Sequence, residues 1–263
     1  MTTKPKRDHV DLASLRLDWA GLALARLICH VDDFLAKEPC QKRRKITSAG
    51  NGDAVLSYFL TISDQPPPEI SFAAGDVIHN LRATLDNLLW GIGQRRKAGR
   101  LLSLEFWGSE EKFNECYAPR ITKLPEPIKD WVESVQPFNT RGFQLYKILT
   151  TLWNNDKHRS PQNIVTAAGM SMDWVGSDDP KVRNPMKSWE SFDPGGQKDN
   201  QLLVRAIVPY AQRDLFTPVL SQFVAFSESG KSGAQNQEVV EYLSHVHSHI
   251  TDRVLPIFEP FRN

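Results

Sequence analysis

The chain has 263 residues, 40% of them hydrophobic and 24% charged, and its 32 basic and 31 acidic side chains leave a formal net charge of +1. This composition is typical of a globular protein with a substantial core, and a charge so balanced gives no global field that would gather nucleic acid. No apolar run approaches the roughly 20 residues that a membrane-spanning helix requires. The basic start is not followed by the apolar segment of a secretory signal, so we expect a cytoplasmic protein without a membrane partner.

Helical periodicity, proline positions and β-branched runs predict the elements in chain order. Helices are expected at about 8–37, 69–93, 110–117, 127–135, 142–158 and 236–255. Strands are expected as a hairpin near 45–62, with a glycine- and asparagine-containing turn, and at about 99–106, 164–174, 201–208 and 219–226. The polar stretch 176–200 is expected to be an exposed loop.

These elements predict an α+β protein, with a bundle of about four main helices and a small antiparallel sheet in a single compact unit. Residues 1–160 would be mainly helical apart from the hairpin near 45–62, and 161–235 would form strands and loops. The C-terminal helix, 236–255, would pack back on the bundle, which makes 1–263 a single domain.

Cysteine and histidine patterns give no sign of a metal or redox site. Cys29, Cys40 and Cys116 are odd in number and widely spaced, so each is expected to be a small buried or half-buried hydrophobic residue. His245 and His249 are four residues apart but no HExxH pattern accompanies them, which favours a solvated or capping role. We therefore predict no cofactor and no metal.

A first polar cluster lies in the helix expected at 69–93. Its apolar stripe occupies one side, and the opposite side carries Asp76, His79, Ala83, Asp86, Asn87 and Trp90, with Asn80 and Arg82 at the borders. Between Ile70 and Gly93 there is no Lys and no Glu, the residues that usually keep a helix face in solvent. The helix is therefore predicted to be covered on both sides, with its polar residues bonded within the protein or at an interface.

A second polar cluster, Asn154-Asn155-Asp156-Lys157-His158-Arg159, ends the helix expected at 142–158. Asp156 follows Leu152 by four residues and so falls in line with the buried stripe, where a carboxylate needs a cation or several N–H donors. Arg82 is the predicted partner, with Lys157 and Arg159 as local competitors. That pair would tie the two helices together and bring His79 and His158 into one neighbourhood.

Two interpretations of these clusters remain open. They can be a buried hydrogen-bond and ion-pair network that fixes how two helices cross. They can also form a site in which His79 and His158 transfer protons, Arg82 stabilises a developing anion, and Asp76, Asn80, Asp86, Asp156, Lys157 and Arg159 support them. Two short basic runs add candidate phosphate contacts, at Arg43 and Arg44 and at Arg95 and Arg96.

The motifs Gly75-Asp76-x-x-His79-Asn80-Leu81-Arg82-x-x-Leu85-Asp86 and Asp156-Lys157-His158-Arg159 resemble a bacterial, actinobacterial-type family. Its signature helix reads about GDxxHNLRxxLDH and a later helix ends in DKHR, with a similar order of elements along about the whole chain. The family brings no assigned activity with it.

A more distant likeness is to HEPN proteins, which are helical, dimerising and often RNA-cleaving, and which carry an Arg followed after four to six residues by a His. This chain departs from the pattern, because Asn87 stands where the His is expected. The likeness implies metal-independent RNA cleavage or RNA binding by a homo-oligomeric accessory or defence factor, with Arg82 on phosphate and the His role moved to His79 or His158. The alternative is a non-catalytic protein that binds a partner protein, with a purely structural polar network; a small-molecule binding module is a third possibility.

Overall fold

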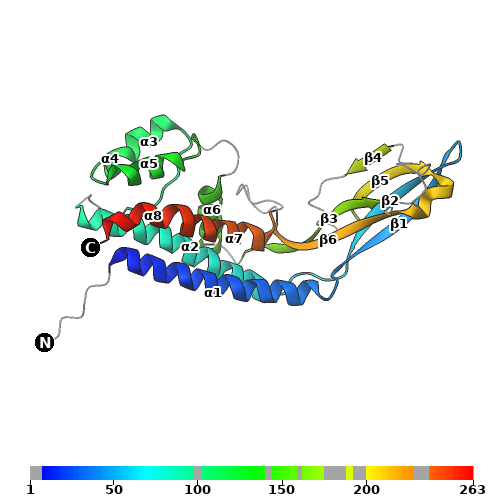
Figure 1. Cartoon of the computed structure of the whole chain (residues 1–263), viewed down its shortest axis with the longest axis horizontal. Helices are drawn as coiled ribbons and strands as arrows, with labels where there is room; N and C mark the ends of the chain where they lie inside the picture. Colours follow the sequence, from blue (N-terminus) through cyan, green and yellow to red (C-terminus); the bar gives the residue numbers. More distant parts are fainter. Residues whose placement is uncertain are drawn as a thin grey trace.

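The computed structural model describes residues 8–96, 102–139, 144–158, 162–174, 188–191, 200–227 and 237–262. Its helices are α1 (His9–Leu35), α2 (Pro68–Arg95), α3 (Glu110–Cys116), α4 (Ala118–Ile121), α5 (Glu126–Ser134), α6 (Leu145–His158), α7 (Val239–His249) and α8 (Leu255–Phe258). Its strands are β1 (Cys40–Gly50), β2 (Asp53–Ile62), β3 (Ile164–Trp174), β4 (Ser188–Ser191), β5 (Leu202–Pro209) and β6 (Phe216–Phe226). The predicted α+β class is confirmed, with helices and sheets in one unit (Figure 1).

Helices α1 and α2 form the base of the helical body and lie side by side over much of their length (Figure 1). Asp8 caps α1 by accepting a hydrogen bond from the Val10 N–H at 2.8 Å. Pro68 starts α2, where its missing N–H costs nothing. Near the N-terminus of α1 the helices approach so closely that a Cβ on Gly91 would lie 2.1 Å from the Cβ of His9, so only glycine fits there.

The remaining helices complete the apolar core of this body. α6 and α7 pack against α2, and α3 to α5 cover its end remote from the sheets (Figure 1). The predicted C-terminal helix continues beyond its expected end, because α7 passes through a π-helical turn at Ile250–Val254 into α8. It packs against α1 and α2.

The strands form two antiparallel sheets in place of the small sheet expected from the sequence. One has the order β1-β2-β5-β4, and the other pairs β3 with β6 from Ile164 opposite Phe226 to Trp174 opposite Phe216. The β1–β2 turn is the predicted one, with positive φ at Gly50, Asn51 and Gly52. The inner face of the larger sheet packs on β3 and β6 around a second apolar core that includes Leu56, Leu60, Val204 and Phe216.

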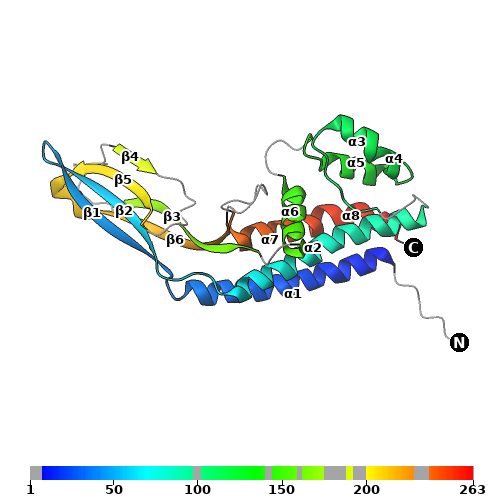
Figure 2. The same cartoon turned by 180° about the vertical axis from the view of Figure 1, so that it is seen from behind.

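A narrow waist joins the helical core to the sheet core (Figure 2). Ser63 donates to the Pro39 carbonyl from its backbone N–H and its hydroxyl, at 2.9 and 3.1 Å. The buried Thr166 hydroxyl donates to the Asp64 carbonyl at 2.9 Å, and the Cys40 N–H donates to the Gln222 side chain at 2.8 Å. These bonds join connecting segments and strands that are distant in sequence.

Two expected elements differ from the structure. The described part of the strand expected at 99–106, from residue 102 on, is extended but belongs to no sheet, whereas 99–101 lie outside the described residues. The loop expected at 176–200 contains the short strand β4, and most of the rest of it lies outside them. No helix in the described part of the chain is long and apolar enough to cross a membrane.

Candidate functional site

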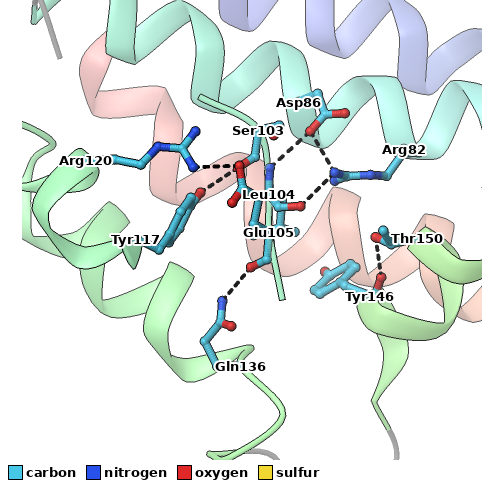
Figure 3. Close-up of polar contacts among 10 residues, drawn as sticks. All are labelled: Arg82, Asp86, Ser103, Leu104, Glu105, Tyr117, Arg120, Gln136, Tyr146 and Thr150. Carbon is cyan, nitrogen blue, oxygen red and sulfur yellow. Dashed lines mark hydrogen bonds and ion pairs between the residues drawn. The ribbon is translucent and has the colours of Figure 1, made fainter. Parts of the chain in front are cut away.

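The first polar cluster is built around a buried guanidinium on α2 (Figure 3). Arg82 is 3% exposed, and its Nη2 donates to the Leu104 carbonyl at 2.7 Å and lies 3.1 Å from the Asp86 carboxylate one turn later. The same carboxylate accepts the Leu104 N–H at 3.1 Å. Arg82 and Asp86 together therefore satisfy both backbone polar groups of one residue in the extended segment 102–107.

Neighbouring side chains hold the rest of that segment (Figure 3). The Tyr117 hydroxyl donates to the Ser103 carbonyl at 2.6 Å, and the Gln136 amide donates to the Glu105 carbonyl at 3.0 Å and accepts the Trp107 N–H at 3.0 Å. Gln136 is fully buried. Nothing in the local sequence indicates these roles, so the sequence analysis missed both Tyr117 and Gln136.

The guanidinium of Arg82 is enclosed by protein. Burial lowers its pKa, and the nearby Asp86 carboxylate offsets part of this effect. Its Nε and Nη1 have no hydrogen-bond acceptor in the structure, while the Trp153 ring lies 5.6 Å from the guanidinium carbon. For Arg82 to engage a phosphate, as the sequence predicts, the 102–107 segment would have to move away.

The predicted Arg82–Asp156 pair does not form. Arg82 takes its local partner Asp86, four residues along the same helix, and the Asp156 carboxylate lies against α2 at Gly75. A Cβ on Gly75 would meet an Asp156 oxygen at 2.9 Å. Gly75 and Arg82 are seven residues apart, or about 10 Å along the helix. A local pair with Asp86 costs less chain ordering than a pair between two helices, which accounts for the difference.

Asp156 belongs instead to an open polar group with Asp76 and His79, which we call the α2–α6 cluster. Burial raises the pKa of Asp156, Gln162 and His79 lower it, and Asp76 raises it further. Asp76 and His79 are exposed, which corrects the expectation that α2 is covered on both sides. Of the predicted catalytic residues, His79 therefore faces solvent near the Asp156 carboxylate, whereas Arg82 is buried.

Of the other residues predicted to support these clusters, the structure describes the side chain of Asn80 but not those of Lys157, His158 and Arg159. Asn80 donates to the Asp76 carbonyl at 2.9 Å within α2. Lys157 and His158 end α6, but their side chains lie outside the structural description, as does the whole of Arg159. The predicted meeting of His79 with His158 therefore stays a prediction.

The predicted phosphate-binding arginines fall at opposite ends of the molecule. Arg95 and Arg96 line a cavity of about 370 Å³ with Arg262, where Arg95 lies 3.5 Å from Asp8, and Arg262 lies near Asp11 and Glu259. Carboxylates thus neutralise much of that cavity. Arg43 and Arg44 lie on β1, at the edge of the larger sheet.

The outer face of the larger sheet carries a group of exposed cations. Lys45, Ser57, Arg205 and Glu190 lie opposite one another in a row across the four strands. Arg43 is two residues before Lys45 on the same face and stacks on Phe59, with its guanidinium carbon 5.0 Å from the ring centre. Arg43, Lys45 and Arg205 are exposed. Arg44 faces the other way and binds Asp214 at 2.7 Å.

The cysteines and histidines form no metal site among the described residues, where no three His, Cys, Asp or Glu side chains are grouped to hold an ion. Cys40 is buried, which raises its pKa to about 11, whereas Cys29 and Cys116 are exposed, contrary to expectation. Exposed helix positions tolerate a small side chain, so the composition argument could not separate the three. His249 bonds the Tyr146 hydroxyl at 2.6 Å, and His247 lies 3.2 Å from the Leu17 carbonyl.

Comparison of the chain with known protein families, with curated proteins and with solved structures gives no match.

Replacing Arg82 by Ala should lower the free energy of unfolding by about 3–5 kcal/mol, because the Leu104 carbonyl loses its donor and a buried ion pair is broken. Urea unfolding monitored by circular dichroism measures the loss. The control is Lys129→Ala, which removes a partly exposed pair with Glu126 within α5 and should cost less than about 1 kcal/mol. Equal effects of the two substitutions would contradict a structural role for Arg82.

Asp156→Asn should stabilise the protein at neutral pH. Burial raises the pKa of Asp156 in the folded state, so its ionisation disfavours folding, and the penalty appears as pH rises through that raised pKa. The parent should match the variant below the ordinary aspartate pKa of about 4 and melt at a lower temperature at pH 7. Melting curves across this range test it, and a parent more stable than the variant at pH 7 would show that the ionised carboxylate is a net stabilising group.

Proposed function

We propose that the protein binds single-stranded RNA across the outer face of its larger sheet. The observation that carries the proposal is the group of Arg43, Lys45 and Arg205 around Phe59, set against the single carboxylate of Glu190 on that row. The cations suit phosphates, and the stacked guanidinium and ring of Arg43 and Phe59 present planar groups on which a base can stack. Bases are free to stack in this way on single strands, whose bases are not paired.

A purely structural explanation accounts for only part of this charge. Edge strands often carry Lys or Arg because an unpaired charged edge resists pairing with other chains. That reason applies to Arg43 and Lys45 on the edge strand β1. It does not apply to Arg205, because β5 lies between β2 and β4 inside the sheet; the structural contact of Arg205 is a cross-strand ion pair with Glu190, 4.0 Å away. Residues Ser57 and Phe59 on β2 are likewise interior, and they continue the polar and aromatic surface between the cations.

A second candidate function, RNA cleavage, is favoured by the α2–α6 cluster. His79 is exposed beside Asp156. Burial raises the pKa of the Asp156 carboxyl, so this carboxylate lies where its charge is disfavoured, as is common at functional sites. In the proposed reaction His79 removes the proton of a ribose 2′-hydroxyl, whose oxygen attacks the adjacent phosphorus. The bond from phosphorus to the 5′-oxygen breaks and that oxygen takes a proton from water, which leaves a 2′,3′-cyclic phosphate and a free 5′-hydroxyl. Asp156 would orient the imidazole and stabilise its protonated form. The cytoplasmic location and the accessory or defence role stay predictions.

The binding proposal predicts distinct effects of the face residues on a fluorescein-labelled oligouridylate, measured by fluorescence anisotropy at several KCl concentrations. Arg43→Ala, Lys45→Ala and Arg205→Ala should each lower the steepness of log K against log salt by about 0.7, since each removes one phosphate contact. Phe59→Ala should weaken binding by about 1–3 kcal/mol at every salt concentration and leave that steepness unchanged.

The matched control is Arg253→Ala, which removes an exposed cation from the π-helical turn after α7 and should leave binding unchanged. Binding unaffected by the combined replacement of all three face cations would rule the proposal out. If those variants instead aggregate, as light scattering would show, the charges of β1 serve to protect the sheet edge.

The cleavage proposal is tested with total cellular RNA in the presence of EDTA. Cleavage should occur without metal and should be lost in His79→Ala, while His30→Ala on α1, which alters a histidine outside the α2–α6 cluster, should retain it. Because His79 is exposed, its variant should melt like the parent. Intact RNA with the parent protein would reject cleavage and leave the binding proposal standing.

A further inference from the structure

An apolar stripe faces solvent on α1. Large hydrophobic side chains with substantial exposure include Leu15 (42%), Trp19 (58%) and Leu22 (61%) on α1 and Phe72 (60%) on α2. Leu12 continues the stripe toward the N-terminus and is half-buried. Exposed apolar groups scattered singly need no explanation, but a contiguous patch of several large residues marks an interaction site.

The spacing of this stripe is that of a helix packed along another helix. Leu12, Leu15, Trp19 and Leu22 follow one another at intervals of three, four and three residues. The buried side of α1 has the same alternation of three and four, in Val10, Ala13, Leu17, Ala20, Leu24, Leu27, Val31 and Phe34. The buried stripe packs against α2 and the rest of the helical core. The exposed stripe repeats about every 3.5 residues as well, so it is suited to pack along a further helix.

The adjoining surface of α2 is also suited to burial. A groove of about 470 Å³ runs between the helices, lined by the stripe from Leu12 to Trp19 together with His9, Arg16, Asn80, Asn87 and Trp90. The indole N–H of Trp90 is buried and has no acceptor in the described part of the chain. Between Ile70 and Gly93 there is no Lys and no Glu, which is the composition of a covered helix face. The structure leaves this face of α2 open, so a covering partner would account for its composition.

Charge and register favour a second copy of α1 in antiparallel orientation as the occupant. A twofold axis level with Leu17 places Leu12 opposite Leu22 of the second copy and Leu15 opposite its Trp19, which aligns the apolar stripe with itself. It also places Arg26 of the second copy level with residue 8, about 4.5 Å along the helix from Asp11. Arg26 and Asp11 are both exposed, and Asp11 also lies 3.5 Å from Arg262. The symmetry produces this opposite-charge contact twice.

We propose that two copies of the chain associate through this surface, here called the α1 face and defined by Leu12, Leu15, Trp19 and Leu22 with Phe72 and Trp90. The apolar stripes form the centre of the contact, and the two Asp11–Arg26 pairs lie at its ends. This association is independent of the sheet face, because it uses none of the residues assigned to RNA.

Sedimentation of the full-length chain from micromolar to submillimolar concentration tests the proposal. The parent should have the mass of two chains, and Trp19→Lys or Leu22→Glu should reduce it to one, with circular dichroism and melting of the monomer preserved because both side chains are exposed. Val219→Glu is the matched control, since Val219 is 41% exposed on β6, away from the α1 face, and this variant should remain dimeric.

A charge exchange tests the register. Arg26→Asp and Asp11→Arg should each weaken the dimer about tenfold or more at low salt, and the double variant should regain most of the affinity. A parent protein that is monomeric throughout the concentration range overturns the proposal, as does a dimer unaffected by Trp19→Lys and Leu22→Glu. Dimers that break with those substitutions but ignore the charge exchange would overturn the antiparallel register.

Discussion

The extended segment 102–107 belongs to no helix or sheet, yet its backbone polar groups must still be paired where it passes over the helical body. Side chains supply these partners. Arg82 and Asp86 bind both polar groups of Leu104, Tyr117 binds the carbonyl of Ser103, and Gln136 binds Glu105 and Trp107. The attachment of α3, α4 and α5 to α2 therefore depends on a few long polar side chains as well as on apolar packing.

This arrangement divides the conspicuous GDxxHNLRxxLD motif into two parts. Arg82 and Asp86 point toward the 102–107 segment and hold it, while Asp76 and His79 remain at the surface near Asp156. The buried-network interpretation thus applies to Arg82 and Asp86 and not to Asp76 and His79. A structural network occupies one part of α2, and groups with free access to solvent occupy another, about two turns away.

Periodicity predicted the long helices, the first hairpin and the strand 164–174 well, because each has a strong local pattern bounded by glycine or proline. It could not separate two apolar stripes on α1, because residues such as Leu17 and Trp19 fit a helical period equally well and only tertiary packing decides which is buried. The predicted partner of Arg82, Asp156, was wrong, because the prediction favoured a pair between two helices over the local pair with Asp86. The roles of Tyr117, Gln136 and Arg205 depend on contacts between distant segments, which have no local signature.

The hydrogen bonds of the waist have a consequence for how freely the two cores can move against each other. Hydrogen bonds of Ser63, Thr166 and Gln222 join the connecting segments to one another. The four connections between the helical core and the sheet core are therefore not independent of one another. Any bending at the waist would have to move all of these joined segments together.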